Sequence, residues 1–409
     1  MRFATLLRAL LRPLVVLTAI AAALVSTPAQ AGPRGTLALR LAAALRQPGV
    51  DLRHTGAVVV DLSTGKTVFA YHPNLSLEPA SNEKLPLTYA ALETLGPGFQ
   101  IHTEVRGEGR LLDGGTWRGN LVLKGYGDPT LSSGDLRVLA GKVRALGIRR
   151  VTGSIVGDES FFDTSRTAPG WKPSYYLEES PPLSALVVDR CQVGARLARR
   201  PAVAAARFFR RALVERGIGV PRSVKAVRAG GRRLAAVASP AMARVLHVMD
   251  RDSDNFRAEE LLKGLGARLG TGGTSKAGAE VVRGVLAERG IPLAGVRIGD
   301  GSGLSSLNRM TPRALVSILA SAWNERAIRP YFAGALARPG RKGTLQHRLL
   351  RGPARTTVLG KTGTTDESSA LSGYVRGRYA FVVIVNGHPV RWWAAHAAQD
   401  RVAELLAAQ

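Results

Sequence analysis

Residues 78–85 of this 409-residue chain read EPASNEKL. Within them, Ser81 and Lys84 are three positions apart, and residues at that spacing share one face of a helix. A neutral lysine amine there can take the proton of the serine hydroxyl, provided that burial or a nearby cation lowers its pKa. The pattern predicts a helix over residues 81–95, with an irregular start because Pro86 disturbs the first turns. Ser81 is therefore a candidate nucleophile, and Lys84 is its candidate base.

A second serine–lysine pair with the same spacing, Ser63 and Lys66, is interpreted differently. It lies between two predicted strands, residues 57–62 and 67–71. This arrangement predicts a hairpin turn. Residues i and i+3 of such a turn need not share a face, so we expect a solvated turn here.

Two further motifs carry reactive side chains. Residues 253–255 read Ser-Asp-Asn, in which a hydroxyl can relay a proton and an amide can bind a substrate amide. Residues 361–364 read Lys-Thr-Gly-Thr and precede two apolar strands, so that they can line a cleft that attracts a carboxylate. Residues 306–308, Ser-Leu-Asn, are interpreted as a polar loop. The order S-x-x-K, S-D-N and K-T-G is typical of class A β-lactamases and penicillin-binding proteins.

Beyond these motifs, most of residues 55–390 resemble the S13 peptidases, the D-alanyl-D-alanine carboxypeptidases and endopeptidases of the penicillin-binding-protein-4 type. Residues 78–85 are similar to the nucleophile segment of this family. The other similar strings are GDPTL at 127–131, DGSGLS at 300–305 followed by Asn308 and Thr311-Pro312, GTL at 343–345, and LSGYV at 371–375.

The resemblance implies an α/β (α+β) fold class. The expected architecture is the serine β-lactamase/DD-peptidase-like transpeptidase fold, an antiparallel sheet flanked by helices and split by a β-rich inserted domain. We expect a DD-peptidase (penicillin-binding) domain over residues 32–96 and 239–409, and the inserted domain over residues 97–238. The interval between Ser81 and Ser253 is long for a class A β-lactamase but short for this family. The second family insert is therefore expected to be reduced or absent.

Periodicity predicts the other elements. Expected helices cover 136–146, 202–216, 240–250, 258–269 and 278–289, with a further helical stretch within 32–54 and a last helix ending near 406. Expected strands include 101–105, 120–123, 154–156, 370–375 and 379–386.

The resemblance assigns catalytic roles to five residues. Ser81 is the acylated nucleophile and Lys84 its general base. Ser253 relays the proton, and Asn255 holds the substrate amide. Lys361 helps to lower the pKa of Lys84 and attracts the terminal carboxylate of the substrate.

The remaining site residues follow Lys361 in the chain. Thr362 and Thr364 contact the substrate carboxylate, and Gly363 lets the substrate lie against the strand. The oxyanion hole is assigned to the backbone N–H groups of Ser81 and Thr364. The implied reaction transfers a peptidyl-D-Ala group to Ser81, releases D-Ala and admits water.

The first 31 residues predict an export signal. Arg2, Arg8 and Arg12 precede an apolar run at 14–25, and Ala-Gln-Ala at 29–31 forms a cleavage site. No later apolar stretch is long enough for a spanning helix. We expect an extracytoplasmic protein, periplasmic or associated with the cell wall, without a transmembrane anchor in the mature chain.

Composition narrows the partners. The chain carries 57 lysines and arginines against 30 acidic residues, a net charge of +27. This balance favours an anionic partner such as a wall polymer, but the excess of arginine over lysine fits codon bias better than a selected binding face. Export argues against nucleic acid. The lone Cys191 cannot form an internal disulfide. The seven histidines lack the spacing of common metal-binding motifs, and we expect neither a metal nor a cofactor.

The function predicted is an exported serine DD-carboxypeptidase/endopeptidase that acts on peptidoglycan stem peptides and is covalently acylated by β-lactams. A β-lactamase or esterase on the same scaffold is the enzymatic alternative; the absence of an E-x-x-L-N element argues against it. A catalytically silent wall-binding protein is the other alternative. The oligomeric state is left open.

Several large or reactive side chains receive structural interpretations. Cys191 is expected to be buried. Trp171, Tyr175 and Tyr176 are expected in core or rim packing, although they can wall a substrate pocket. Residues 392–393, Trp-Trp, are expected to pack the last helix, and Asp128 is expected in a turn.

Overall fold

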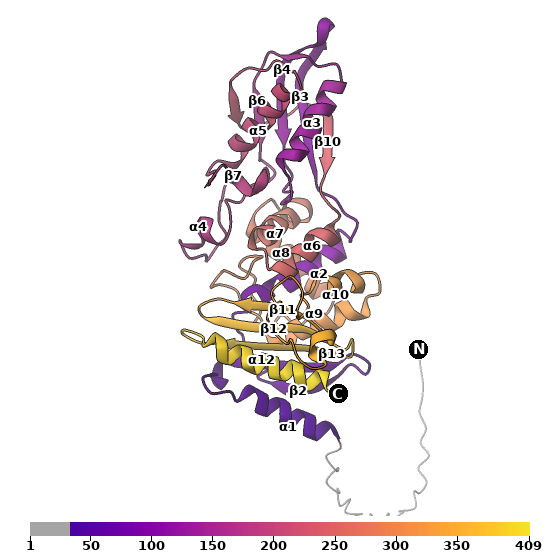
Figure 1. Ribbon diagram of the computed structural model, residues 1–409, viewed down its shortest axis with the longest axis vertical. Coiled ribbons are helices and arrows are strands. Elements are labelled where there is room, and N and C mark those ends of the chain that lie inside the picture. The colour runs from indigo at the N-terminus through magenta and orange to yellow at the C-terminus, as the bar shows by residue number, and fades with distance from the viewer. Residues whose placement is uncertain (1–32) are drawn as a thin grey trace, which may run out of the picture.

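The computed structural model describes residues 33–409. The predicted signal peptide, residues 1–31, lies outside this range. Figure 1 shows one sheet toward each end of an elongated molecule, with a group of helices between them. Among residues 33–409, no helix combines the length and apolarity that crossing a membrane requires.

The first sheet is antiparallel and has five strands in the order β11-β12-β13-β1-β2. Its strands are β1 (Thr55–Asp61), β2 (Lys66–Tyr71), β11 (Val358–Thr364), β12 (Ser368–Val375) and β13 (Tyr379–Asn386). β12 is buried throughout, and β13 is buried up to its last residue. Helices cover both faces of the sheet, so β13 is a nearly continuous apolar run, whereas β12 also buries three serines.

Two helical layers cover this sheet, each with its own apolar core. One layer consists of α1 (Pro33–Leu45) and α12 (Trp392–Ala407). The opposite layer contains α2 (Lys84–Thr94), α6 (Met242–Asp252), α7 (Asn255–Leu269), α8 (Ser275–Glu288), α9 (Pro312–Asn324) and α10 (Arg329–Ala335). The short α11 (Ala354–Thr357) and the 3₁₀ helix η1 (Leu52–His54) lie in connections.

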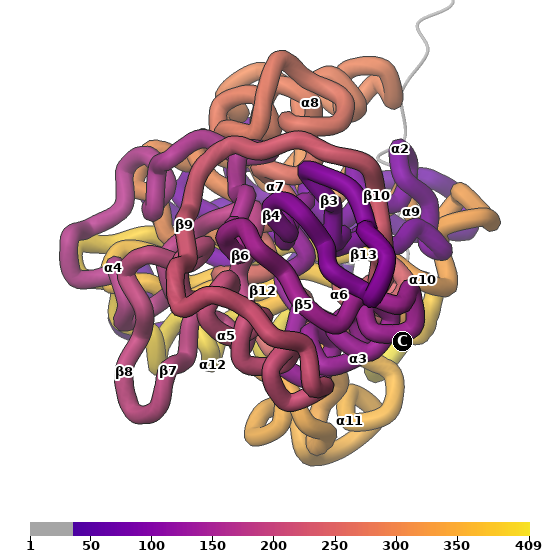
Figure 2. Tube along the Cα trace, turned by 90° about the horizontal axis from the view of Figure 1, so that it is seen from above, coloured from indigo at the N-terminus to yellow at the C-terminus, as the bar shows by residue number. Residues whose placement is uncertain are grey.

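The second sheet is mixed and is built from residues 102–238. Its strands are β3 (His102–Leu112), β4 (Thr116–Lys124), β5 (Arg150–Val151), β6 (Ile155–Asp158), β9 (Val224–Ala226) and β10 (Arg232–Ala238). Figure 2 shows α3 (Ser133–Ala145) and α5 (Pro201–Glu215) lying side by side against this sheet. The chain also forms η3 (Asp113–Gly115), α4 (Tyr175–Glu178), η4 (Asp189–Cys191) and a small hairpin of β7 (Gln192–Val193) and β8 (Arg196–Leu197).

The α/β fold class, with helices flanking an antiparallel sheet, is confirmed. The expected helix at 202–216 is α5, and the expected hairpin at 57–71 is β1 and β2. The helix predicted to begin at Ser81 instead begins at Lys84, after the 3₁₀ helix η2 (Ala80–Glu83). In the stretch 32–54, the α-helix α1 ends at Leu45, and only the short 3₁₀ helix η1 follows. Neither α9 nor β10 was expected.

Candidate active site

Ser81 and Lys84 lie at the junction between sheet and helices. Ser81 sits in η2, and Lys84, which is fully buried, begins α2. Their side chains meet, with Lys84 Nζ 3.0 Å from Ser81 Oγ. The pair at Ser63 and Lys66 does not meet in this way, because Ser63 Oγ donates to Asp61 in an ordinary turn between β1 and β2.

Two further groups hold the Lys84 amine. Nζ lies 2.9 Å from Asn255 Oδ1 and 2.5 Å from the carbonyl oxygen of Ser302. Both of these oxygens only accept hydrogen bonds, whereas the hydroxyl of Ser81 also donates. A neutral amine has two N–H donors and one lone pair. It can therefore donate to the two oxygens while its lone pair faces the Ser81 hydroxyl.

Burial lowers the pKa of Lys84 to about 8. The carboxylates of Asp300 and Asp250 act in the opposite direction and keep the shift from being larger. Burial also raises the pKa of Glu259 to about 8. Of the two causes expected from the sequence, burial and a nearby cation, burial is the largest cause of the lowered Lys84 pKa.

Lys361 lies on β11 and is fully buried. Its Nζ donates to Ser253 Oγ at 2.9 Å and to the carbonyl oxygen of Thr362 at 2.8 Å. Burial and the positive charge of Lys84 both lower the pKa of Lys361, and Asp250 opposes them. Lys361 therefore lies buried beneath the cleft, where burial and the neighbouring Lys84 favour the neutral form of its amine.

The Ser-Asp-Asn motif is the junction between α6 and α7. Ser253 ends α6 in a left-handed conformation, with φ 59° and ψ 42°. Asp254 caps α7 by accepting from the backbone N–H of Arg257, and it also pairs with Arg190. Asn255 is the first residue of α7. Its oxygen faces Lys84, while its Nδ2 lies 3.2 Å from Glu179 Oε2, so the amide nitrogen is the side that can donate to a substrate.

Gly363 allows the close packing of β11 against η2. A Cβ at this position would lie 2.9 Å from both the carbonyl oxygen of Pro79 and the backbone nitrogen of Ser81. The sequence analysis gave this glycine a role toward substrate. In the structure, Gly363 also packs against the segment that carries Ser81. The spacing of the motifs in the sequence does not reveal this contact.

The loop that presents the Ser302 carbonyl was not among the predicted site residues. Asp300 organises it by accepting from Ser302 Oγ and from the backbone N–H groups of Gly303 and Ser305. Glu259 accepts from the backbone N–H of Ser302 at 2.7 Å. The DGSGLS string was the available signal, but it did not indicate that a backbone carbonyl contacts the lysine.

Asn308, in the segment interpreted as a polar loop, belongs to this same arrangement. It is buried and donates to Asp300 Oδ1 at 2.6 Å. Trp171 donates its ring N–H to the other oxygen of Asp300 at 2.8 Å. Asn308 and Trp171 therefore have structural roles, as expected. Both hold Asp300 and so support the loop that contacts Lys84.

A cleft of about 950 Å³ opens over these groups. The predicted site residues that line it are Ser81, Ser253, Asn255, Thr362, Gly363 and Thr364. Lys84 and Lys361 are brought to the same place but lie beneath its surface. Tyr175 and Glu179 form part of the wall, so Tyr175 lies at the rim of the site.

The expectation for Trp392 and Trp393 is wrong. Their relative exposures are 58% and 55%, and both line the cleft. They occupy the first turn of α12, whereas the buried face of this helix is formed by residues such as Ala395, Ala398 and Val402. The two tryptophan side chains thus form an apolar part of the cleft wall instead of packing against the rest of α12.

Two smaller expectations can also be compared. Cys191 is buried, as expected, and burial raises the pKa of its thiol to about 12. Asp128 is a turn residue that accepts from the backbone N–H and hydroxyl of Thr130. Within residues 33–409, no group of three or more histidine, cysteine or acidic side chains is arranged to hold a metal ion.

The layered fold and the serine–lysine cleft define a protein of the DD-peptidase class. The chain belongs to the D-Ala-D-Ala carboxypeptidase 3 (S13) family, which matches residues 37–202 and 195–409, and it is a D-Ala-D-Ala carboxypeptidase. A D-alanyl-D-alanine carboxypeptidase of Actinomadura sp. (strain R39) is 30% identical over 89% of this chain and 83% of its own length. Carboxypeptidase DacB of Mycolicibacterium smegmatis is 32% identical over 86% of this chain and 78% of its own length.

A solved structure has the same fold. Penicillin binding protein 4 (dacB) from Haemophilus influenzae superposes with a TM-score of 0.77 at 22% identity, covering 88% of this chain and 98% of the other. A predatory peptidoglycan endopeptidase from Bdellovibrio bacteriovorus, Bd3459, superposes with a TM-score of 0.53 at 15% identity, over 81% of this chain and 86% of the other.

Proposed function

We propose that this carboxypeptidase works through an acyl-enzyme on Ser81 and acts on the stem peptides of peptidoglycan. The observation that carries the proposal is the environment of Lys84. Two acceptor oxygens and one hydroxyl surround its buried amine, which suits a neutral base facing Ser81. A pKa near 8 leaves a useful neutral fraction close to neutral pH.

In the acylation step, Ser81 Oγ attacks the carbonyl carbon of the penultimate D-Ala and gives its proton to Lys84. The N–H groups of Ser81 and Thr364 stabilise the resulting oxyanion. The C–N bond then breaks, and the proton passes through Ser253 to the amine of the departing D-Ala. Water subsequently attacks the ester carbonyl, the ester C–O bond breaks, and Ser81 regains its proton.

The terminal carboxylate of the substrate would lie on β11. Thr362 and Thr364 line the cleft, and the Nζ of Lys361 lies below them. Burial lowers the pKa of Lys361, and a bound carboxylate would favour its charged form. Asn255 donates its Nδ2 to the substrate amide. β-Lactams would acylate Ser81 in the same orientation, because their carboxylate and strained amide take the places of those of the peptide.

Release of D-Ala from a synthetic pentapeptide stem tests this proposal. The wild type and Ser63→Ala should release D-Ala at equal rates, whereas Ser81→Ala should release none above background. Ser63 is the matched control, because it has the same spacing to a lysine but lies in a surface turn. Activity retained in Ser81→Ala would overturn the proposal.

Endopeptidase action on D-Ala cross-links is the second candidate activity. The cleft favours it because it extends past Ser81 to the exposed Trp392 and Trp393, where a longer acyl donor or a second stem could lie. A purified cross-linked dimer of muropeptides separates the two activities. Conversion of dimer to monomer supports endopeptidase action, and an unchanged dimer alongside D-Ala release restricts the enzyme to carboxypeptidase action.

We also propose that the chain is exported after removal of residues 1–31 and that residues 97–238 form the inserted domain between 32–96 and 239–409. Strands confined to residues 102–238 form the second sheet, which supports these boundaries. The alignment with the Actinomadura relative runs over 451 positions, more than this chain has residues. The relative therefore carries segments that this chain lacks, in keeping with a reduced or absent second insert.

A further inference from the structure

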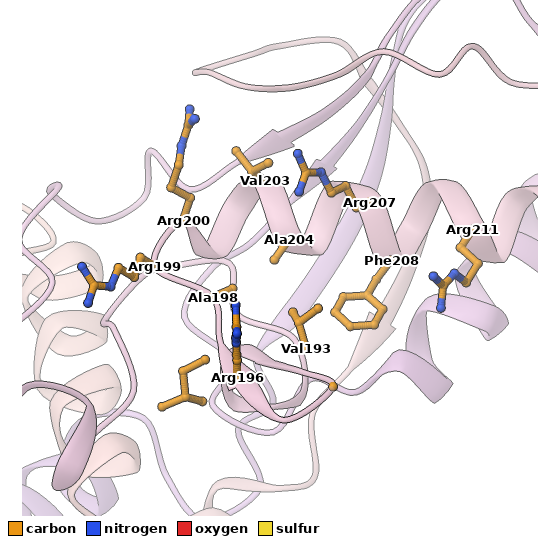
Figure 3. Close-up of a pocket in the computed structure, with 12 residues that line it drawn as sticks. Val193, Arg196, Ala198, Arg199, Arg200, Val203, Ala204, Arg207, Phe208 and Arg211 are labelled. Atoms are coloured by element: carbon orange, nitrogen blue, oxygen red, sulfur yellow. The ribbon is translucent and has the colours of Figure 1, made fainter.

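A second cavity lies far from Ser81 in the chain, between α5 and the β7–β8 hairpin. Figure 3 shows arginine side chains on both sides of it, with Val193 and Phe208 between helix and hairpin. Its volume is about 690 Å³. Five arginines line it, and we call them the groove arginines: Arg196, Arg199, Arg200, Arg207 and Arg211.

The groove arginines are exposed and free of partners. Among the described residues, none of their side chains forms an ion pair, hydrogen bond or ring contact. No acidic residue lines the cavity. Some arginines on the same part of the molecule are paired, such as Arg166 with Glu159 and Arg106 with Glu104, and the other unpaired ones do not line this cavity. Five uncompensated cations around one cavity create a field that attracts an anion.

The spacing of these arginines indicates the shape of that anion. Arg200, Arg207 and Arg211 are seven and four residues apart, so they lie along one face of α5 and its N-cap. At 1.5 Å per residue, the row is roughly 16 Å long. A single phosphate or carboxylate cannot contact all three, whereas a linear chain with repeated anionic groups can.

The floor of the groove indicates what kind of unit separates the anionic groups of the ligand. Val193, Leu197, Val203 and Phe208 line the cavity between the arginines. Apolar contact of this kind suits carbon-bearing units between anionic groups. Guanidinium groups bind phosphate through two parallel N–H donors, which makes phosphodiesters well suited to these side chains.

We propose that this groove binds a linear cell-wall polymer whose repeating units are joined by phosphodiesters. The choice of a wall polymer over other polyanions rests on the proposed action on peptidoglycan. The position of the groove is consistent with it. The hairpin begins one residue after Cys191, and the preceding Arg190 pairs with Asp254 beside Asn255 of the active site. A polymer held in the groove would keep the catalytic cleft close to its substrate.

Binding of fluorescent poly(glycerol phosphate) to the full mature chain tests the proposal. The groove variant replaces all five groove arginines with glutamine. The control variant makes the same change at five exposed arginines without partners outside the groove: Arg110, Arg118, Arg137, Arg222 and Arg228. Equal charge loss in both variants separates the site from the net charge of the protein.

We expect the groove variant to lose affinity by at least about tenfold, because five guanidinium contacts with the polymer are removed together. The control variant should stay within about threefold, and D-Ala release from a soluble peptide should be unchanged in both. Equal losses in the two variants, or no binding by the wild type, would overturn the proposal. Stronger binding to phosphatidylglycerol vesicles than to the polymer would assign the groove to a membrane and also overturn it.

This test is independent of the acyl-enzyme. The polymer should bind Ser81→Ala as tightly as the wild type. Loss of peptidase chemistry with retained binding would refute the proposed function alone. Loss of groove-dependent binding with retained D-Ala release would refute only the polymer site.

Discussion

Replacing Gly363 with alanine tests the packing that positions Ser81. The new Cβ would lie 2.9 Å from the Pro79 carbonyl oxygen and the Ser81 nitrogen, and 3.0 Å from Ala80 Cβ. These neighbours belong to the backbone and first side-chain atom of η2, so no flexible side chain can move aside. Relief of the contacts requires η2 to shift by about half an ångström relative to β11, at a cost of about 1–3 kcal/mol in stability.

The same shift would disturb the reaction. Ser81 lies in η2 and Thr364 in β11, so the shift would separate the two N–H groups that we propose as the oxyanion hole. Misplacement by about 1 Å costs about a hundredfold in rate, and we therefore expect acylation to fall by about ten- to a hundredfold. The measurement is the second-order rate constant for labelling by a fluorescent penicillin, together with the melting temperature.

Gly360→Ala is the matched control on the same strand. Its Cβ would meet the side-chain ends of Leu371 and Leu345 at 3.0 and 3.2 Å, and these side chains can adjust. We expect its labelling rate to stay near that of the wild type. The reasoning is refuted if Gly363→Ala is labelled as fast as the wild type, or if Gly360→Ala slows labelling by the same factor.

Three further perturbations have expected outcomes. Below a pH of about 8 Lys84 is protonated and cannot accept a proton, so the labelling rate should rise about tenfold per pH unit and level off above 8; a flat profile from pH 6 to 9 would contradict its role as base. Burial raises the pKa of Glu260 from 4.5 to about 8, so the folded protein binds one more proton than the unfolded chain between these values. The contribution of Glu260 to the free energy of unfolding should fall by about 1.4 kcal/mol per pH unit as pH rises through this window. In denaturant melts, the stability of Glu260→Gln relative to the wild type should therefore increase from pH 5 to 8. If the stabilities of the two proteins change with pH in parallel, the pKa shift is excluded. Asp300→Asn removes an acceptor from the loop that presents the Ser302 carbonyl, and stopped-flow labelling should slow by about tenfold at an unchanged secondary-structure content, an outcome that wild-type labelling would negate.

The local part of the active site could be predicted from the sequence, because it depends on spacing along one helix. Ser81 and Lys84 meet as their three-residue separation predicts, even though a 3₁₀ helix precedes α2. The long-range part could not be predicted in this way. The Ser302 carbonyl reaches Lys84 only because Asp300 and Glu259 shape a loop more than two hundred residues away in the chain.

Among the elements that the sequence did not predict, α9 and β10 have identifiable reasons. α9 carries ordinary start signals, since Thr311 caps it and Pro312 occupies its first position, but these residues were considered only as part of a family string. β10 begins with two exposed arginines and contains three alanines, a composition with little strand preference. Its pairing with β3 is decided by tertiary contacts.

The error at Trp392 and Trp393 has a similar origin. Large aromatic side chains are usually buried, and the helix that follows them is apolar on its inner face. The direction of the first turn of α12 depends on where β13 ends, which the sequence around the tryptophans does not specify. Their exposure over the cleft became visible only once the sheet and α12 were placed together.

The central claim is that Ser81 is the residue that becomes acylated. The most direct measurement is the intact mass of the mature protein after brief incubation with benzylpenicillin, followed by peptide mapping. We expect the wild type and Ser63→Ala to gain the mass of one penicilloyl group on the peptide that contains Ser81, and Ser81→Ala to gain nothing. An adduct that maps to another residue, or that persists in Ser81→Ala, would contradict the account.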